Sequence, residues 1–273
     1  MIPVAVLAGL CEGSGMALDP EQPDTVLIAD NEQAGELFRY TLDGVPLGSV
    51  GGLDLAGVKL GTRVEDIEAL AVDATDVWVV GSHSRSKSGE RRPERERILQ
   101  VHSGTSTVWT IDWEKCTACQ ADTFEAERNV EGAAFWTAHL WLGLRAPLLD
   151  GRSLLVELTP KAGTTTFEVS GAYPLDLGGM AIVDLAVQPG RPDLLWILAG
   201  ASTGKAAPVV FELPGPLATP KRHLLALPED AEGIVVLANG GARVVTDGAT
   251  AKGAVPGESV CKTTSTFYRS DKL

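Results

Sequence analysis

The sequence predicts an all-β protein, a five-bladed β-propeller that is closed by its N-terminal strand pairing with the last blade. A pattern of small and apolar residues, a turn and a second apolar strand occurs five times. The copies start at residues 14, 68, 131, 184 and 232, so that they lie 54, 63, 53 and 48 residues apart. These periods fit a four-stranded blade with long loops. The 30 Gly and 16 Pro are typical of many short strands separated by turns.

The first strand of each copy begins with a polar residue and continues with small and apolar ones. These strands are expected at Ser14–Leu18, Glu68–Val72, Glu131–Phe135, Asp184–Val187 and Glu232–Val236. Apolar second strands are expected at 25–29, 77–80, 140–144, 194–198 and 242–245. Amphipathic third strands follow at 36–40, 97–101, 153–157, 209–212 and 265–269, and fourth strands at 107–111, 165–169 and 222–226.

The fifth copy ends after its third strand, whereas the apolar residues 1–10 belong to no complete copy. We therefore expect residues 1–10 to close the ring, which removes two exposed sheet edges. The blades extend over roughly 14–50, 68–113, 131–170, 184–227 and 232–271 within a single domain of residues 1–273. A β-sandwich of similar short strands is the alternative. The near-equal periods and the absence of Greek-key signals favour the propeller.

The composition excludes several classes of partner. The 36 acidic and 23 basic residues give a net charge of −13, which disfavours nucleic acid and anionic lipid surfaces. No run of 18 apolar residues occurs, so we expect no membrane span. The apolar N-terminus lacks the positive region of a secretory signal, and four cysteines are too few for a disulfide scaffold. The expected location is cytoplasmic.

Acidic residues are expected to converge at one end of the central channel, because first strands begin and second strands end on the same face of a blade. Glu68, Glu131 and Glu232 share one register, which predicts that their carboxylates hold a hard cation, Ca²⁺ or Mg²⁺. Asp184 fits less well, because aligning Ala186 with Ala71 places Val183 in this register.

The ends of the second strands supply further candidates for the same site. His83 is the predicted proton-transfer residue, acting together with Glu131. Asp30, Arg85 and Arg145 are the predicted substrate-binding residues, the two arginines taking the anionic part of the substrate. In the alternative interpretation, Arg85 and Arg145 pair with Glu68 and Glu131 and simply hold neighbouring blades together.

Two segments outside the repeats carry additional polar or reactive residues. The charged insertion Ser84–Arg97 is either an anion-receiving hairpin or a solvated loop. Cys116 and Cys119 have the spacing of half a zinc site, but no second pair of ligands follows them. A local disulfide or two free thiols is the expected outcome.

The sequence resembles a bacterial family known as domain of unknown function 3616. The matching segments extend over most of the chain: Ser14–Leu18 with Ile28–Glu32, Asp66–Leu70 with Gly81–Arg85, Asn129–Ala133 with Gly143–Pro147, and Glu232–Val236. Gly81-Ser-His-Ser-Arg85 is the most specific of them. The resemblance implies a β-propeller fold and transfers no reaction. More distantly, the acidic first strands look like those of calcium-dependent lactonase and phytase-like propellers.

Two functional hypotheses are compatible with these residues. The first is a hydrolase of a small anionic ester, lactone or phosphoester, in which a Ca²⁺ or Mg²⁺ ion activates water or polarises the substrate. The second is a non-catalytic propeller that binds a small-molecule ligand or a protein partner through its polar face.

Overall fold

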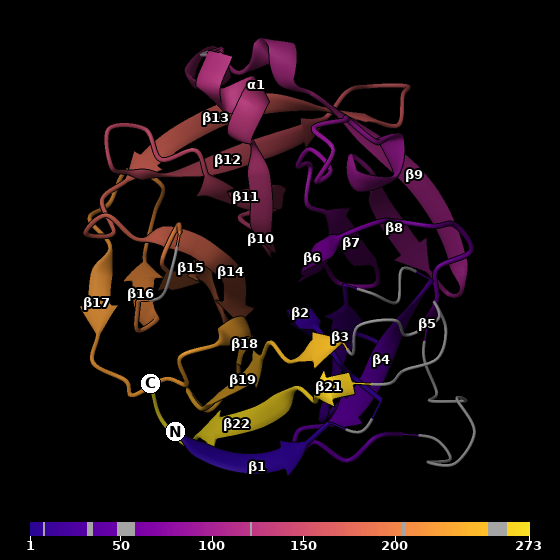
Figure 1. Cartoon of the computed structure of the whole chain (residues 1–273), viewed down its shortest axis with the longest axis vertical. Coiled ribbons are helices and arrows are strands. Elements are labelled where there is room, and N and C mark those ends of the chain that lie inside the picture. The colour runs from indigo at the N-terminus through magenta and orange to yellow at the C-terminus, as the bar shows by residue number, and fades with distance from the viewer. Residues whose placement is uncertain (8, 32–34, 48–57, 121, 204–205, 251–260) are drawn as a thin grey trace.

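The computed structural model describes residues 1–7, 9–31, 35–47, 58–120, 122–203, 206–250 and 261–273. Its strands form an all-β, propeller-like fold in which sheets surround a central axis (Figure 1). No helix in the described segments has the length and apolar character needed to span a membrane.

The sheets follow the repeats in chain order, and each successive pair of strands within a copy runs antiparallel. The first comprises β2 (Gly13–Leu18), β3 (Thr25–Asp30), β4 (Glu36–Thr41) and β5 (Val58–Lys59). The second copy contributes β6 (Ile67–Val72), β7 (Val77–Gly81), β8 (Ile98–His102) and β9 (Thr105–Asp112), and the third β10 (Asn129–Trp136), β11 (His139–Ala146), β12 (Ser153–Pro160) and β13 (Thr166–Leu175). The fourth contains β14 (Ala181–Gln188), β15 (Arg191–Gly200), β16 (Val209–Leu213) and β17 (Lys221–His223).

The last sheet combines the two ends of the chain. Its strand order is β1-β22-β19-β18, from β1 (Ile2–Val6), β22 (Thr266–Ser270), β19 (Ala242–Thr246) and β18 (Ala231–Val236). β1 pairs antiparallel with β22, and Leu7 N donates to Ser265 O just beyond this pairing. The N-terminal strand therefore occupies the position that the fifth copy lacks (Figure 1).

Buried apolar side chains fill the spaces between neighbouring sheets. Five hydrophobic clusters are present in the described residues, and each draws from two consecutive copies, the last joining the fifth copy to the first. Aromatic rings dominate the cluster between the second and third copies, where Trp78 stacks on Phe135 with centroids 5.8 Å apart. Alternate side chains of a first strand point to opposite faces of its sheet, so each first strand is buried in the clusters on both sides.

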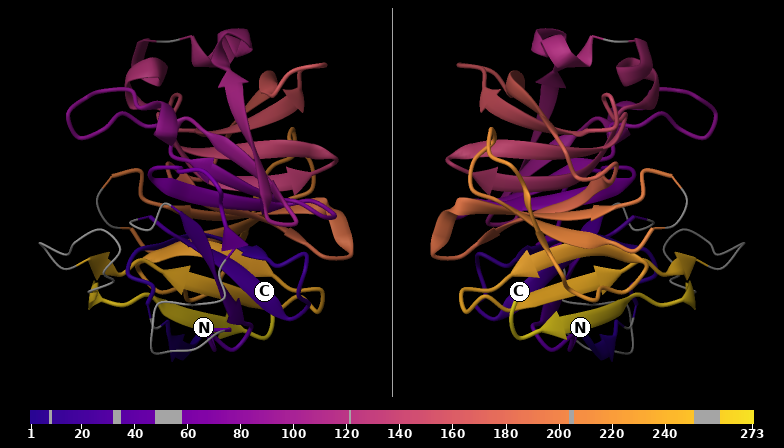
Figure 2. Two further views of the ribbon diagram at one scale, coloured as in Figure 1. Left: turned by 90° about the vertical axis from the view of Figure 1, so that its right-hand side faces the viewer. Right: turned by 90° about the vertical axis from the view of Figure 1, so that its left-hand side faces the viewer.

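One sheet contact was not expected from the repeats. β9 and β13, the outer strands of the second and third copies, pair in parallel through residues 110–112 and 166–168. This pairing joins two groups of four strands into one eight-stranded sheet. Figure 2 shows the purple second copy and the pink third copy next to each other in two side views.

The connections between strands differ from the expectation in several places. The fourth strand predicted at 222–226 is shorter and lies at β17, and a small hairpin forms from β20 (Ala249–Thr250) and β21 (Cys261–Thr263). A short helix, α1 (Asp122–Glu127), follows the 3-10 turns η2 (Trp113–Lys115) and η3 (Thr117–Cys119), and another, η1 (Pro93–Arg95), lies in the charged insertion.

Cys116 and Cys119 form a disulfide beneath this helix, with Cα atoms 5.0 Å apart. The first of the two alternatives for this pair is therefore confirmed. The cytoplasmic location stays a prediction.

Candidate functional site

A β-bulge recurs at the same place in all five pairs of first and second strands. The pairing register shifts between Gly13 and Met16, Ile67 and Ala69, Val130 and Gly132, Ile182 and Asp184, and Ala231 and Gly233. The residues passed over are Ser14 with Gly15, Glu68, Glu131, Val183 and Glu232. A bulge re-aims a side chain out of the normal alternation, which explains how acidic residues emerge from otherwise apolar strands.

Four of the five bulges, through Ser14, Glu68, Glu131 and Glu232, border a polar cavity of about 150 Å³. Its lining comprises Glu12, Gly13, Ser14, Asn31, Glu68, Glu131, Arg145, Glu232 and Asp247. The three glutamates predicted as metal ligands and the predicted substrate-binding Arg145 are therefore brought together.

Arg145 is the one positively charged residue among those that line this cavity. Its Nη1 lies 3.1 Å from Glu131 Oε2 and 4.0 Å from Glu232 Oε2. Asn129 Nδ2 donates to the other oxygen of Glu131 at 2.6 Å. Asn31 Nδ2 donates to Glu68 Oε1 at 3.2 Å. Glu131 therefore has an ionic partner and an amide donor, as the pairing alternative predicts for Arg145.

Burial and mutual repulsion raise the pKa values of the carboxylates. Burial, followed by the charge of Glu131, raises the pKa of Glu68 well above its usual value. Burial also raises the pKa of Glu131, although Arg145 opposes this shift. The pKa of Glu232 rises to about 8, mainly through burial and then through Glu131. The pKa of Asp247 rises to about 6, mainly through burial and then through the negative charge of Glu12.

Asp184 does not line this cavity. Its carboxylate is fully buried and accepts hydrogen bonds from Leu185 N at 2.8 Å and from Ile234 N at 2.7 Å. The second bond crosses from the fourth copy to the fifth. Val183 occupies the bulge position, as the register alignment predicts, so Asp184 serves to join the two sheets.

His83, Arg85 and Asp30 also lie outside the lining of the cavity. His83 is buried and packs edge-on against Trp113, and neither ring nitrogen has a hydrogen-bond partner. Burial, with Arg128 and Arg91 nearby, lowers its pKa to about 3. Arg85 pairs with Glu125 and donates to Gly89 O. Asp30 is buried and accepts from Cys11 N at 2.9 Å. The roles predicted for these three residues are not supported by their positions.

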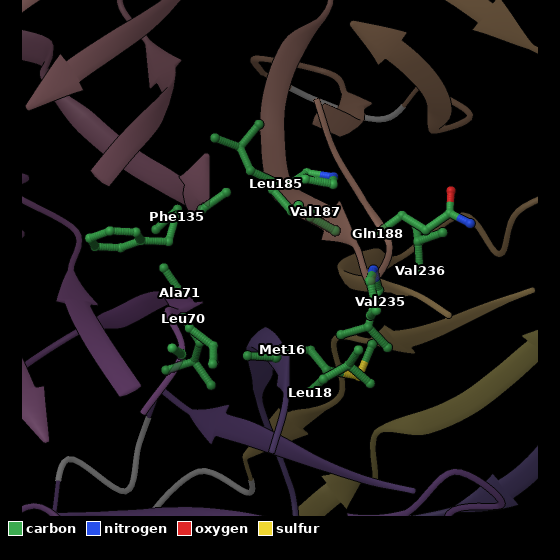
Figure 3. A pocket seen from close by; sticks show the side chains of 18 of the residues that line it. Met16, Leu18, Leu70, Ala71, Phe135, Leu185, Val187, Gln188, Val235 and Val236 are labelled. Carbon is green, nitrogen blue, oxygen red and sulfur yellow. The ribbon is translucent and has the colours of Figure 1, made fainter. Parts of the chain in front are cut away.

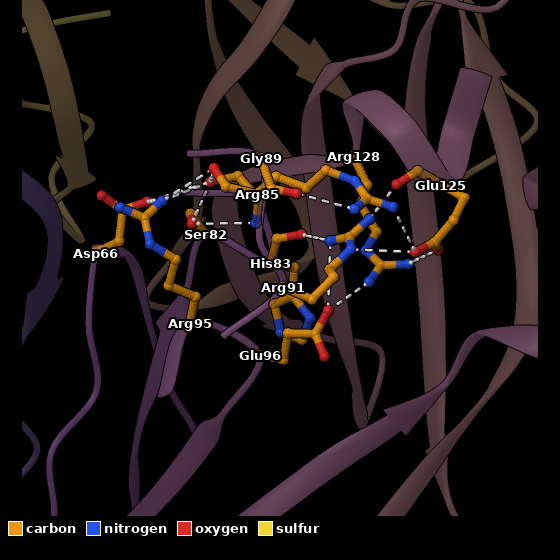
Figure 4. A network of polar contacts seen from close by, with 11 residues as sticks. Asp66, Ser82, His83, Arg85, Gly89, Arg91, Arg95, Glu96, Glu125 and Arg128 are labelled. Atoms are coloured by element: carbon orange, nitrogen blue, oxygen red, sulfur yellow. Dashed lines mark hydrogen bonds and ion pairs between the residues drawn. The ribbon is translucent and has the colours of Figure 1, made fainter. Parts of the chain in front are cut away.

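The arginines of the charged insertion pair within the chain. Arg91 contacts Glu96 and Glu125, and Arg95 contacts Asp66 (Figure 4). Arg92 pairs with Glu65 at 3.3 Å. These ion pairs favour a structural role for the insertion over the reception of an external anion.

The three predicted metal ligands border one cavity, and their binding of an ion is untested by this arrangement. The part of the chain that the structure describes contains no group of three His, Cys, Asp or Glu side chains placed to hold an ion. The guanidinium of Arg145 lies within 4.0 Å of Glu131 and Glu232 and therefore already offsets part of their negative charge. Ca²⁺ or Mg²⁺ binding remains a prediction.

Glu12 is the lining residue that sequence reasoning missed. It immediately precedes β2 and belongs to no repeat position, so no periodic signal marks it. Asn31 and Asp247 follow the second strands β3 and β19, at the place where convergence was expected.

Residues 125–250 match the family described as "Protein of unknown function (DUF3616)". The resemblance to domain of unknown function 3616 is thereby confirmed, over a segment that begins within α1 and ends at β20. No curated protein matches the sequence significantly.

The chain is also similar to solved structures over most of its length. Bacteroides ovatus Xyloglucan PUL GH43B aligns with a TM-score of 0.56 and 10% identity, covering 98% of this chain and 53% of that one. YCF48 from Cyanidioschyzon merolae aligns with a TM-score of 0.43 and 13% identity, covering 90% and 64%. Myxococcus xanthus glutaminyl cyclase aligns with a TM-score of 0.47 and 14% identity, covering 98% and 93%. The chain thus spans about half the length of GH43B, and the likeness to GH43B shows the fold alone.

Proposed function

We propose that the chain is a five-bladed propeller, closed through β1 and β22, that binds a small organic cation in the acidic cavity. The blade count is supported by the first strands, which contact one another in the cyclic order β2, β6, β10, β14, β18 and back to β2. This proposal keeps the blade boundaries expected from the repeats, and four of the five bulges border the acidic cavity.

One observation carries the binding proposal: the cavity lining contains five carboxylates and a single arginine. The carboxylates belong to Glu12, Glu68, Glu131, Glu232 and Asp247. The guanidinium of Arg145 already forms an ion pair there, which supports the complementarity of the walls to a planar or compact organic cation. A ligand ammonium group would replace the protons that the raised pKa values hold on the carboxylates. Binding should therefore release protons near pH 7.

Titration calorimetry tests this proposal with ethylammonium and 1,4-diaminobutane as probes, n-propanol as the neutral control, and Ca²⁺ and Mg²⁺ as separate arms. We expect saturable binding of the amines with proton release, detected by repeating the titration in buffers of different ionisation enthalpy. Glu232→Gln should weaken amine binding by about tenfold, which corresponds to about 1.4 kcal/mol. Glu114→Gln, at an exposed carboxylate elsewhere, should leave it unchanged.

The experiment has two outcomes that overturn the proposal. One is the absence of any saturable amine binding. The other is binding of Ca²⁺ or Mg²⁺ without binding of the amines, which would restore the predicted metal site at Glu68, Glu131 and Glu232.

A second candidate function rests on the different surroundings of two carboxyl groups in this cavity. Glu131 is paired with Arg145, whereas Glu232 lies at 4.0 Å from the same guanidinium and has a pKa of about 8. A carboxylate held by an arginine and a nearby carboxyl with a raised pKa can serve as base and acid in hydrolysis. Glu131 would take a proton from water as the hydroxide bonds to the ester carbonyl carbon, and Glu232 would protonate the leaving alkoxide as its bond to carbon breaks.

Turnover of small uncharged esters and lactones tests this second candidate. Glu131→Gln and Glu232→Gln should each lower kcat at least about a hundredfold while the fold is retained. Turnover that survives in both variants would contradict the assignment.

A further inference from the structure

A second cavity lies at the opposite end of the same first strands. It has a volume of about 580 Å³ and is bordered by the C-terminal halves of these strands, including Met16 to Leu18, Leu70 to Val72 and Ala133 to Phe135. Leu185 to Gln188 and Val235 with Val236 complete the ring. Because the acidic cavity is bordered by the beginnings of the same strands, the two cavities open on opposite faces of the ring.

The lining of this second cavity is apolar on all sides. No residue that lines it carries a charge. Gln188 is its one polar side chain, and the carboxamide points away from the centre of the cavity (Figure 3). There Gln188 Nε2 donates to Ala238 O at 3.3 Å. The walls are therefore formed by aliphatic, aromatic and small side chains from all five copies.

A water molecule would form few hydrogen bonds in this cavity. A water molecule in a cavity needs two to four polar partners, and these walls offer few. A charged ligand would lose its hydration without gaining an ion pair. An uncharged apolar molecule would bury its surface against the walls at no such cost, with about 25 cal/mol gained per Å² of apolar surface removed from water.

The size and shape of the space also indicate the kind of occupant. Its volume lies within the range of roughly 300–1,000 Å³ found for sites of small-molecule ligands. Strands from five directions enclose it laterally, which suits a compact molecule better than an extended chain. We propose that this apolar cavity is a second binding site, independent of the acidic one, for an uncharged apolar small molecule.

The test uses Nile red, an uncharged dye whose fluorescence rises in apolar surroundings, with the full chain. We expect saturable 1:1 binding, and displacement by n-decanol at least about tenfold better than by decanoate of the same chain length. 1,4-Diaminobutane, the probe of the acidic cavity, should not displace the dye, because no charged residue lines the apolar cavity. Failure of dye binding therefore leaves the cation-binding proposal standing, and the reverse also holds.

Two variants at the partly exposed rim locate the site. Ala74→Trp fills its edge, and Val187→Lys places a charge at its mouth. Each should weaken dye binding at least about tenfold. Ala126→Trp and Val45→Lys, at exposed positions elsewhere, are the matched controls and should bind as the natural chain does. Circular dichroism and thermal melting confirm that all four variants fold.

Three results would overturn the proposal. These are the absence of saturable dye binding, binding that neither rim variant weakens, and equal competition by decanol and decanoate. Light scattering adds a fourth: a dimer of the natural chain that Val187→Lys dissociates would show that a second copy, and not a small molecule, covers the cavity.

Discussion

Arg145 connects two carboxylates that belong to different parts of the ring, since its Nη1 lies 3.1 Å from Glu131 and 4.0 Å from Glu232. Arg145 and Glu131 are on the adjacent strands β11 and β10, whereas Glu232 is on β18, which belongs to a sheet two copies further along the chain. The guanidinium thus extends across the acidic cavity. It reduces the repulsion that would otherwise oppose bringing the acidic bulges together.

Replacing Arg145 should destabilise the protein. Arg145→Met leaves buried Glu131 with no cation, and we expect a loss of about 2 kcal/mol in the free energy of unfolding measured by urea denaturation. The double variant Arg145→Met with Glu131→Gln should recover part of this loss, because the uncompensated charge is removed as well. A double variant whose loss is the sum of the two single losses would show that the pair does not interact.

The raised pKa of Glu232 makes the protein less stable as the pH rises. A carboxyl with a folded-state pKa of about 8 binds its proton more tightly when folded than when unfolded. Its stabilising contribution is complete below the unfolded pKa near 4.5 and is lost as the pH rises towards 8. Glu232→Gln should flatten the slope of stability against pH in this window, by at most about 1.4 kcal/mol per pH unit. Urea denaturation from pH 5 to 8.5 measures it, and an unchanged slope would contradict the assignment.

His83 should have the opposite effect on stability, at lower pH. Its folded-state pKa of about 3 lies below the model-peptide value of 6.5, so its contribution is present above pH 6.5 and is lost as the pH falls towards 3. His83→Phe, which cannot titrate, should therefore make the stability profile shallower between pH 6.5 and 3. NMR of the imidazole provides a direct check. A ring that titrates near pH 6.5 would rule out the buried neutral state.

Gly15 is required where two neighbouring first strands approach each other. A Cβ atom at Gly15 would lie 2.6 Å from Ala69 Cα and 2.7 Å from Leu70 N, both backbone atoms that have little room to shift. Gly15→Ala should therefore destabilise the fold by about 2 kcal/mol or more. Gly215→Ala is the matched control, because nothing lies within 4 Å of its added Cβ. Equal melting temperatures for the two variants would contradict this close approach.

The sequence repeats were sufficient to place most strands and the acidic bulge positions. Small and apolar residues alternate in the first strands. In three of them an acidic residue, Glu68, Glu131 or Glu232, interrupts the alternation at the same register, and the structure has a bulge there. The register alignment also correctly separated Asp184 from the glutamates, since Val183 takes the bulge position in the fourth copy.

The positions that could not be predicted depend on contacts outside the repeat. His83 has a positive φ of 54°, which turns the chain at the end of β7, and its ring packs on Trp113 in a segment without periodicity. Arg85 pairs with Glu125 in α1, a short helix with no apolar period to announce it. His83 and Arg85 follow the second strand β7, and Arg145 lies at the end of the second strand β11. Of these three residues only Arg145 lines the cavity, and tertiary packing decides this.

The parallel pairing of β9 with β13 makes the second and third copies a single cooperative unit at their outer rim. Elsewhere an edge strand can fray by breaking hydrogen bonds to one neighbour, whereas β9 and β13 each have a neighbour on both sides. Opening either strand therefore disturbs two repeats at once. Local opening at this rim should therefore be more cooperative than fraying of an edge strand with one neighbour.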